Sequence, residues 1–140
     1  MTLLLDPQGV EVGTELPALE LPPLSRLTLA LYCGASGDHN PIHVDIDFAK
    51  RAGYPDVFAH GMLSMAFLAR ALTAWVPQKR LLSYGVRFAA ITQVADRVQC
   101  TGKVVEKLEY RGRPCVRIEL TASRNGEQVT LSGDAIVALD

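Results

Sequence analysis

The sequence lacks the features that mark several classes of protein. Its 14 basic and 15 acidic side chains are scattered along 140 residues and give a formal net charge of -1. Proteins that bind nucleic acid or anionic membranes usually carry a basic patch, so no nucleic acid and no membrane is expected as a partner. The chain also contains no internal repeat and no low-complexity segment.

Cysteine is scarce. The three residues, Cys33, Cys100 and Cys115, are an odd number without CxxC spacing. Disulfide frameworks and structural zinc sites usually need paired cysteines at short, regular spacings. The sequence therefore predicts three reduced thiols, and because free cysteine packs as a small hydrophobe, we expect them to be mostly buried.

The start of the chain, MTLLLDPQG, carries no basic segment and no long apolar run. A secretory signal needs both features, and a membrane-spanning helix needs about 20 apolar residues. The sequence therefore predicts a cytoplasmic protein.

The chain does have enough apolar residues for one core. A length of 140 residues is too short for two ordinary domains, so residues 1–140 are expected to form a single domain. Apolar residues make up 49% of the chain, which indicates a generous core together with an apolar surface covered by a partner.

The first half of the chain predicts short elements. Residues 12–21 are expected to supply one strand before the prolines of LPPLS end it. Ser25 and Asp45 have the side chains favoured at helix N-caps, so a short helix is predicted after each. In the first of these helices one apolar stripe is predicted, consisting of Leu27, Leu31 and Ala35.

The longest helical pattern covers residues 60–76, where Arg70 is almost the only charge and Pro77 follows the end. A helix that is apolar on nearly all sides is usually buried, so this one is predicted to lie in the core.

From Leu81 onward the apolar residues alternate with a period of two. Four strands are predicted, at residues 82–90, 97–110, 114–123 and 127–139, with a tight hairpin at Asn125-Gly126. An antiparallel sheet needs cover on one face, which the 60–76 helix can provide. The predicted fold class is therefore α+β, with the sheet wrapped around one long central helix. The inward residues of the last two strands are expected to be Val116, Ile118, Leu120 and Ala122, and then Val129, Leu131, Gly133, Ala135 and Val137.

The octet SGDHNPIH, residues 36–43, suits neither a regular helix nor a regular strand. Asn40-Pro41 forces a turn between Asp38 and His43, and such a turn can direct both side chains at one small volume. A carboxylate and an imidazole, with ordinary pKa values of about 3.9 and 6.5, can hold a water and exchange protons with it. From the spacing alone, ordinary turn and capping roles for these residues are favoured over a catalytic pair.

Three neighbouring residues offer other chemistry. His39 is expected to point away from Asp38 and His43, and His60, at the entrance of the long helix, is expected to make a structural hydrogen bond. A zinc site built from His39, His43 and His60 would lack any recognised ligand spacing. The N-H of Gly61, at the start of the helix, can stabilise a developing oxyanion, or Gly61 can simply permit close packing.

Taken together, the stretches YCGASGDHNPIHVDIDFA and AHGML resemble the MaoC-like, or hydratase 2, family of hot dog fold enzymes. The motif of that family pairs an aromatic residue with a small-residue stretch, the sequence G-D-x-N-P-aliphatic-H and a later small residue. The matching positions are Tyr32, Gly37, Asp38, Asn40, Pro41, Ile42, His43 and Ala49.

The resemblance implies an (R)-specific hydratase/dehydratase acting on trans-2-enoyl and (R)-3-hydroxyacyl thioesters of coenzyme A or acyl carrier protein, without metal or redox cofactor. It implies that Asp38 and His43 are catalytic, that Asn40 supports the loop and that the Gly61 N-H binds the thioester carbonyl. Some relatives have a serine along the central helix where this chain has Ala69, which leaves the preferred acyl length open.

Other functions compatible with these residues are a (3R)-hydroxyacyl-ACP dehydratase subunit of fatty-acid synthesis, a noncatalytic acyl-binding subunit and a thioesterase. Exposed sheet edges favour association, so a homodimer joined edge to edge is expected, with a heterodimer containing a second hot dog subunit as the alternative.

Overall fold

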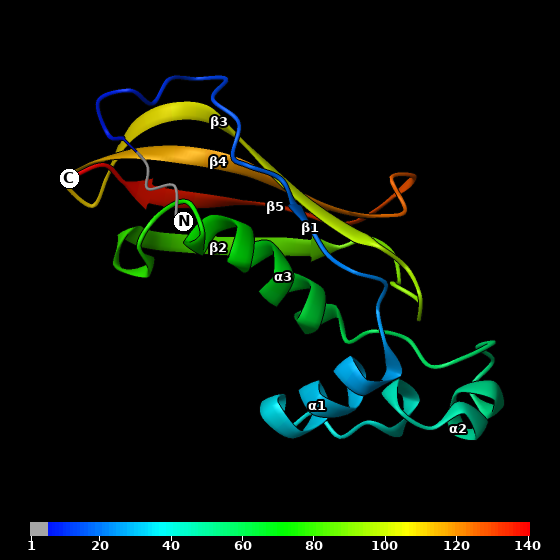
Figure 1. The fold of residues 1–140 in the computed structure, drawn as a ribbon. Coiled ribbons are helices and arrows are strands. Elements are labelled where there is room, and N and C mark those ends of the chain that lie inside the picture. The colour runs from blue at the N-terminus through cyan, green and yellow to red at the C-terminus, as the bar shows by residue number, and fades with distance from the viewer. Residues whose placement is uncertain (1–5) are drawn as a thin grey trace.

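A computed structural model describes residues 6–140, in which one helix packs against one face of a curved antiparallel sheet (Figure 1). This arrangement confirms the predicted fold class. Within the described residues, no helix has the length and apolar composition needed to cross a membrane. In chain order the elements are β1 (Leu19–Glu20), α1 (Arg26–Ser36), η1 (Pro41–His43), α2 (Ile46–Arg51), α3 (Gly61–Thr73), η2 (Gln78–Arg80), β2 (Leu81–Phe88), β3 (Val98–Tyr110), β4 (Arg113–Arg124) and β5 (Gln128–Ala138).

The sheet has the strand order β1-β3-β4-β5-β2, and every neighbouring pair is antiparallel. Tight turns join β3 to β4 and β4 to β5. At Asn125 and Gly126, φ is 54° and 68°, a left-handed conformation that asparagine and glycine tolerate. The predicted hairpin is therefore confirmed.

The core lies between α3 and the concave face of the sheet. Leu68 and Leu72 of α3 are fully buried there against strand residues that include Val104 of β3. Fully burying one such side chain contributes about 1.5–3 kcal/mol to stability. The predicted inward set of β4 is fully buried, as expected, and consists of Val116, Ile118, Leu120 and Ala122.

The predicted inward set of β5 is wrong at its first member. Ala122 pairs with Leu131 but Ser123 pairs with Val129, so the register shifts between them and Thr130 is the extra residue. A bulge of this kind reverses the facing of the residues beyond it. Val129 is consequently 42% exposed, and Thr130 is fully buried.

Three predictions for the helices and the first strand also need correction. In α1 the stripe containing Leu27 and Leu31 is exposed, and Leu29 and Cys33 are buried instead. The strand predicted at 12–21 is reduced to β1, because the residues before it follow β3 through scattered hydrogen bonds and one isolated bridge, Glu15 to Lys103, without forming a continuous ladder. α3 ends at Thr73, and one of its faces, including Met62, is exposed.

The cysteine prediction is confirmed. Cys33, Cys100 and Cys115 are free and buried. Burial raises the pKa of the Cys100 thiol to about 11, so this sulfur stays protonated and packs as a hydrophobe.

Two short helices lie apart from the sheet. α1 and α2 sit beyond the N-terminal end of α3, and the octet lies where the chain passes from α1 to α2 (Figure 1). α2 begins where Asp45 caps it, with the Asp45 Oδ1 accepting hydrogen bonds from the N-H groups of Asp47 and Phe48. This packing brings residues 38–43 beside residues 58–61.

Candidate active site

The loop that carries Asp38 begins at a defined stop of α1. Gly37 takes a left-handed conformation, with φ at 76°, and its N-H donates to the Cys33 carbonyl, which closes the helix. The Ser36 hydroxyl donates to the Tyr32 carbonyl at 2.7 Å and accepts from the Asp38 N-H at 3.1 Å. The backbone is therefore turned away from the helix axis just before Asp38.

Two side chains of the loop bond to the backbone two residues ahead. The Asp38 Oδ1 accepts from the Asn40 N-H at 3.2 Å, and the Asn40 Oδ1 accepts from the Ile42 N-H at 3.1 Å, which caps η1. Such bonds are characteristic of Asx turns. They hold one oxygen of the Asp38 carboxylate on the backbone and leave the other, Oδ2, available.

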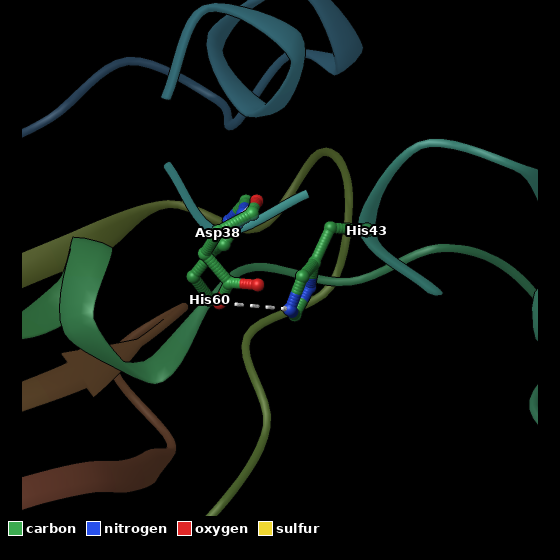
Figure 2. Close-up of side chains that lie close together, drawn as sticks. All are labelled: Asp38, His43 and His60. Carbon is green, nitrogen blue, oxygen red and sulfur yellow. Dashed lines mark hydrogen bonds and ion pairs between the residues drawn. The ribbon is translucent and has the colours of Figure 1, made fainter. Parts of the chain in front are cut away.

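The structure brings Asp38 and His43 together. Asp38 Oδ2 lies 3.9 Å from His43 Nε2, as the dashed line in Figure 2 marks, and the side chains are 51% and 10% exposed respectively. His43 Nδ1 is 2.8 Å from the Phe58 carbonyl, which can only accept, so Nδ1 carries the hydrogen. With the hydrogen on Nδ1, the neutral form of His43 has its lone pair on Nε2, which lies across from the carboxylate at a distance too long for a direct hydrogen bond and suited to a bridging water.

His60 lies within the same cluster. Its side chain is buried, and its ring stacks on that of His43 with centroids 3.7 Å apart and planes 22° apart. Its Nε2 lies 3.4 Å from the Asp38 carbonyl and 3.4 Å from the Cys33 sulfur. Burial, followed by the charge of His43, lowers the pKa of His60, which keeps this ring neutral near pH 7.

Gly61 is the first residue of α3, so its N-H has no acceptor within the helix. It lines a cavity of about 310 Å³ together with His43, Ser64 and Phe88. The Phe88 ring also lies so close that a Cβ at position 61 would approach its edge to 2.8 Å. The structure is therefore compatible with both roles expected for Gly61: its N-H can bind a ligand in the cavity, and its lack of a side chain lets Phe88 pack closely.

A metal ion was a possible alternative for this cluster. Ligand atoms of Asp38, His43 and His60 lie within 4.8 Å of one another, whereas His39 is exposed and takes no part. The two stacked rings have nearly parallel planes, so their in-plane lone pairs do not converge on one point as tetrahedral coordination requires. The arrangement suits a bridging water better than a cation.

Sequence reasoning missed two contributors to this site. The Phe58 carbonyl orients His43. Every residue has a backbone carbonyl, so the residue type at position 58 could not indicate this role. For His60 a structural hydrogen bond was expected, and one is present, but its stacking against His43 was not foreseen. The available signal was its position directly before Gly61 in the AHGML stretch.

Comparison with known proteins identifies the family. Residues 10–125 match the model of the MaoC like domain. Over 116 residues the chain is 32% identical to an (R)-specific enoyl-CoA hydratase of Rhodospirillum rubrum, covering 81% of this chain and 78% of that one. A mitochondrial 3-hydroxyacyl-[acyl-carrier-protein] dehydratase of Arabidopsis thaliana is 26% identical over 109 residues, 77% of this chain and 66% of the relative.

The fold also agrees with that of a solved R-hydratase structure. The R-hydratase PhaJ1 of Pseudomonas aeruginosa superposes with a TM-score of 0.82 at 26% identity, over 95% of this chain and 84% of that one. This likeness confirms the hot dog arrangement that the motif implied. The chain belongs to the MaoC-like family of hydratases and dehydratases.

Proposed function

We propose that this protein is an (R)-specific hydratase/dehydratase that interconverts trans-2-enoyl and (R)-3-hydroxyacyl thioesters, with coenzyme A as the carrier. The observation that carries the proposal is the 3.9 Å gap between Asp38 Oδ2 and His43 Nε2, at a cavity that is lined by both His43 and Gly61, the first residue of α3. The relative from Rhodospirillum rubrum, an (R)-specific enoyl-CoA hydratase, supports the same reaction.

In the hydration direction, a water held between Asp38 Oδ2 and His43 Nε2 attacks Cβ of the enoyl thioester. As the new C-O bond forms, one proton leaves the water for this acid/base pair and one proton is delivered to Cα, so the double bond is consumed. Negative charge grows on the thioester oxygen during the attack. The Gly61 N-H is placed to stabilise that charge, and dehydration follows the same path in reverse.

The direct test is the ultraviolet absorbance of crotonyl-CoA and longer enoyl-CoAs, which falls when the conjugated double bond is hydrated. Asp38→Asn and His43→Gln should each lower kcat on the order of 10²- to 10⁴-fold, with a much smaller change in thioester binding. Exposed neighbours provide matched controls: Asp47→Asn and His39→Gln should behave as wild type. Unchanged absorbance with the wild-type protein across the panel would refute the proposal.

The carrier is the main alternative within the same chemistry. The similarity to an acyl-carrier-protein dehydratase supports a role as a (3R)-hydroxyacyl-ACP dehydratase subunit. Comparing kcat/KM for one acyl chain on coenzyme A and on acyl carrier protein decides between the two carriers, and extending the chain stepwise gives the preferred length.

Two other functions are compatible with the same fold, and each would give a different result in these assays. A thioesterase would release free thiol from the thioester, which a thiol reagent detects, whereas the proposed reaction leaves the thioester intact. A noncatalytic acyl-binding subunit would bind thioesters equally well before and after the Asp38→Asn change and would have no activity to lose.

We further propose that residues 1–140 act as one hot dog domain that forms a homodimer by pairing β2 with its counterpart. β2 is an eight-residue edge strand that, within the described residues, pairs only with β5. Such an edge is normally covered. A heterodimer with a second hot dog subunit is the competing arrangement.

A further inference from the structure

We infer that His60 is a positioning residue for the proposed reaction: its buried ring holds His43 by stacking and holds Asp38 through the Asp38 carbonyl. The inference rests on the proposed function, because it assigns Asp38 and His43 their roles in the chemistry. His60 is not among the residues that line the cavity of His43 and Gly61, so it acts on the reaction through its two neighbours.

The hydrogen-bond partners fix the tautomer of His60. A carbonyl oxygen only accepts, so the 3.4 Å contact with Asp38 requires hydrogen on His60 Nε2. The other nitrogen, Nδ1, is buried and has no partner among the described residues. A protonated His60 would therefore bury an N-H without an acceptor, which is costly, so the neutral Nε2-H form is the one that the site accommodates.

Stacking gives the second half of the inference. The His43 ring is held at its edge by the Phe58 carbonyl and on its face by His60, at 3.7 Å between centroids. The His60 ring is in turn packed edge-on by Tyr32, at 4.7 Å. His43 can thus keep Nε2 aimed at the Asp38 carboxylate without a side-chain hydrogen bond at that nitrogen, which remains free for the water.

A neutral neighbour also suits proton transfer. His43 must gain and lose a proton in each turnover, and a second cation 3.7 Å away would oppose that gain. The ionisable residues that contact His60 are His43, Asp38, Tyr32 and Cys33. Burial raises the pKa of the Cys33 thiol, so it adds no negative charge that would help protonate His60.

Two substitutions separate the two contacts. His60→Phe keeps a flat ring against His43 but removes the hydrogen bond to Asp38, whereas His60→Gln keeps a donor near the Nε2 position and removes the stacked ring. Each should lower kcat on the order of 10- to 100-fold with KM for crotonyl-CoA little changed, because misplacement of reacting groups acts mainly on the transition state. His39→Gln, on the same loop but exposed, is the control and should keep wild-type kinetics.

Each outcome of this experiment decides the inference. Folded His60→Phe and His60→Gln proteins with wild-type kcat, or with a change confined to KM, would overturn it while leaving the hydratase proposal standing; an inactive wild-type protein would instead count against the proposed function. Histidine-selective ¹⁵N NMR of the wild-type protein at pH 7 gives a test that needs no variant. Observation of the Nε2-H tautomer at His60 supports the inference, and the Nδ1-H tautomer or an imidazolium overturns it.

Discussion

At the scale of single residues, the site depends on side chains that bond to their own loop. Asp38 and Asn40 each accept a hydrogen bond from the N-H two residues ahead. The Ser36 hydroxyl donates to a carbonyl of α1 and accepts from the Asp38 N-H in the loop. These contacts use polar groups that regular secondary structure would otherwise have satisfied. The loop is thereby held in one conformation, and the carboxylate keeps an oxygen directed at His43.

Removing the Asn40 cap tests this account. Asn40→Ala should lower the free energy of unfolding by about 1 kcal/mol, the usual cost of a lost N-cap acceptor, and should also lower kcat because the loop loses its fixed shape. Urea denaturation and steady-state kinetics measure the two effects. Asn40→Ser, which restores an acceptor oxygen, should recover most of both; an Asn40→Ala protein with unchanged stability would contradict the capping role.

The lowered pKa of His60 makes the stability of the protein depend on pH. This pKa is lower in the folded protein than the ordinary 6.5, through burial first and the charge of His43 second. Below about pH 6.5 the unfolded chain therefore binds more protons at this position than the folded one, so stability falls as the pH falls. The unfolding midpoint of the wild type should drop more between pH 7.5 and pH 5.5 than that of His60→Gln, and equal drops would contradict the pKa shift.

At the scale of secondary-structure elements, periodicity predicted which segments form strands and helices better than it predicted which side faces inward. The inward set of β4 is correct throughout, whereas Val129 of β5 is exposed because Thr130 is an extra residue in that strand. A bulge depends on the pairing of two strands, which period-two alternation in one strand does not contain. The prediction for α1 failed for a similar reason: Leu27 and Leu31 are exposed, because the spacing of apolar residues in one helix does not determine which side of it packs against the rest of the protein.

The start of α3 offers a matched pair of glycine substitutions. Gly61→Ala adds a methyl group at 2.8 Å from the Phe88 ring, so this ring, which lines the cavity, must shift, and kcat/KM should fall on the order of 10- to 100-fold. Gly34→Ala, inside α1, adds a methyl group with nothing within 4 Å and should raise the free energy of unfolding by about 0.5–1 kcal/mol with unchanged kinetics. Wild-type kinetics in Gly61→Ala would show that this backbone position does not face the substrate.

At the scale of the whole molecule, the sequence could predict the fold class and the convergence of Asp38 and His43 but not the third member of the cluster. The octet lies in one stretch of chain, so turn chemistry alone could place its ends together. His60 reaches His43 from 17 residues further along, through the packing of α1 and α2 beyond the end of α3. Contacts of that kind are set by tertiary structure, and local pattern carries little information about them.

The same scale explains the apolar surface of the chain. Phe88, which lines the cavity, is 56% exposed, and Met62, next to the cavity residue Gly61, is 54% exposed. Within the described residues, β2 also leaves one edge unpaired. A second copy joined along β2 would pair that edge and extend the sheet, and it would cover apolar surface close to the cavity. Burial in such a dimer interface would account for the high apolar content of the sequence.

A homodimer makes stability depend on protein concentration. Sedimentation equilibrium should give twice the 15.2 kDa of one chain, and the thermal midpoint should rise with concentration, because each tenfold increase stabilises the dimer by about 1.4 kcal/mol relative to two unfolded chains. Met62→Glu places a charge on the surface that is expected to be covered, so it should lower the midpoint and shift the mass towards 15.2 kDa, whereas Val12→Glu, on an exposed residue elsewhere, should not. A wild-type protein that stays monomeric with a concentration-independent midpoint would leave β2 without this partner and would favour pairing with a second hot dog subunit instead.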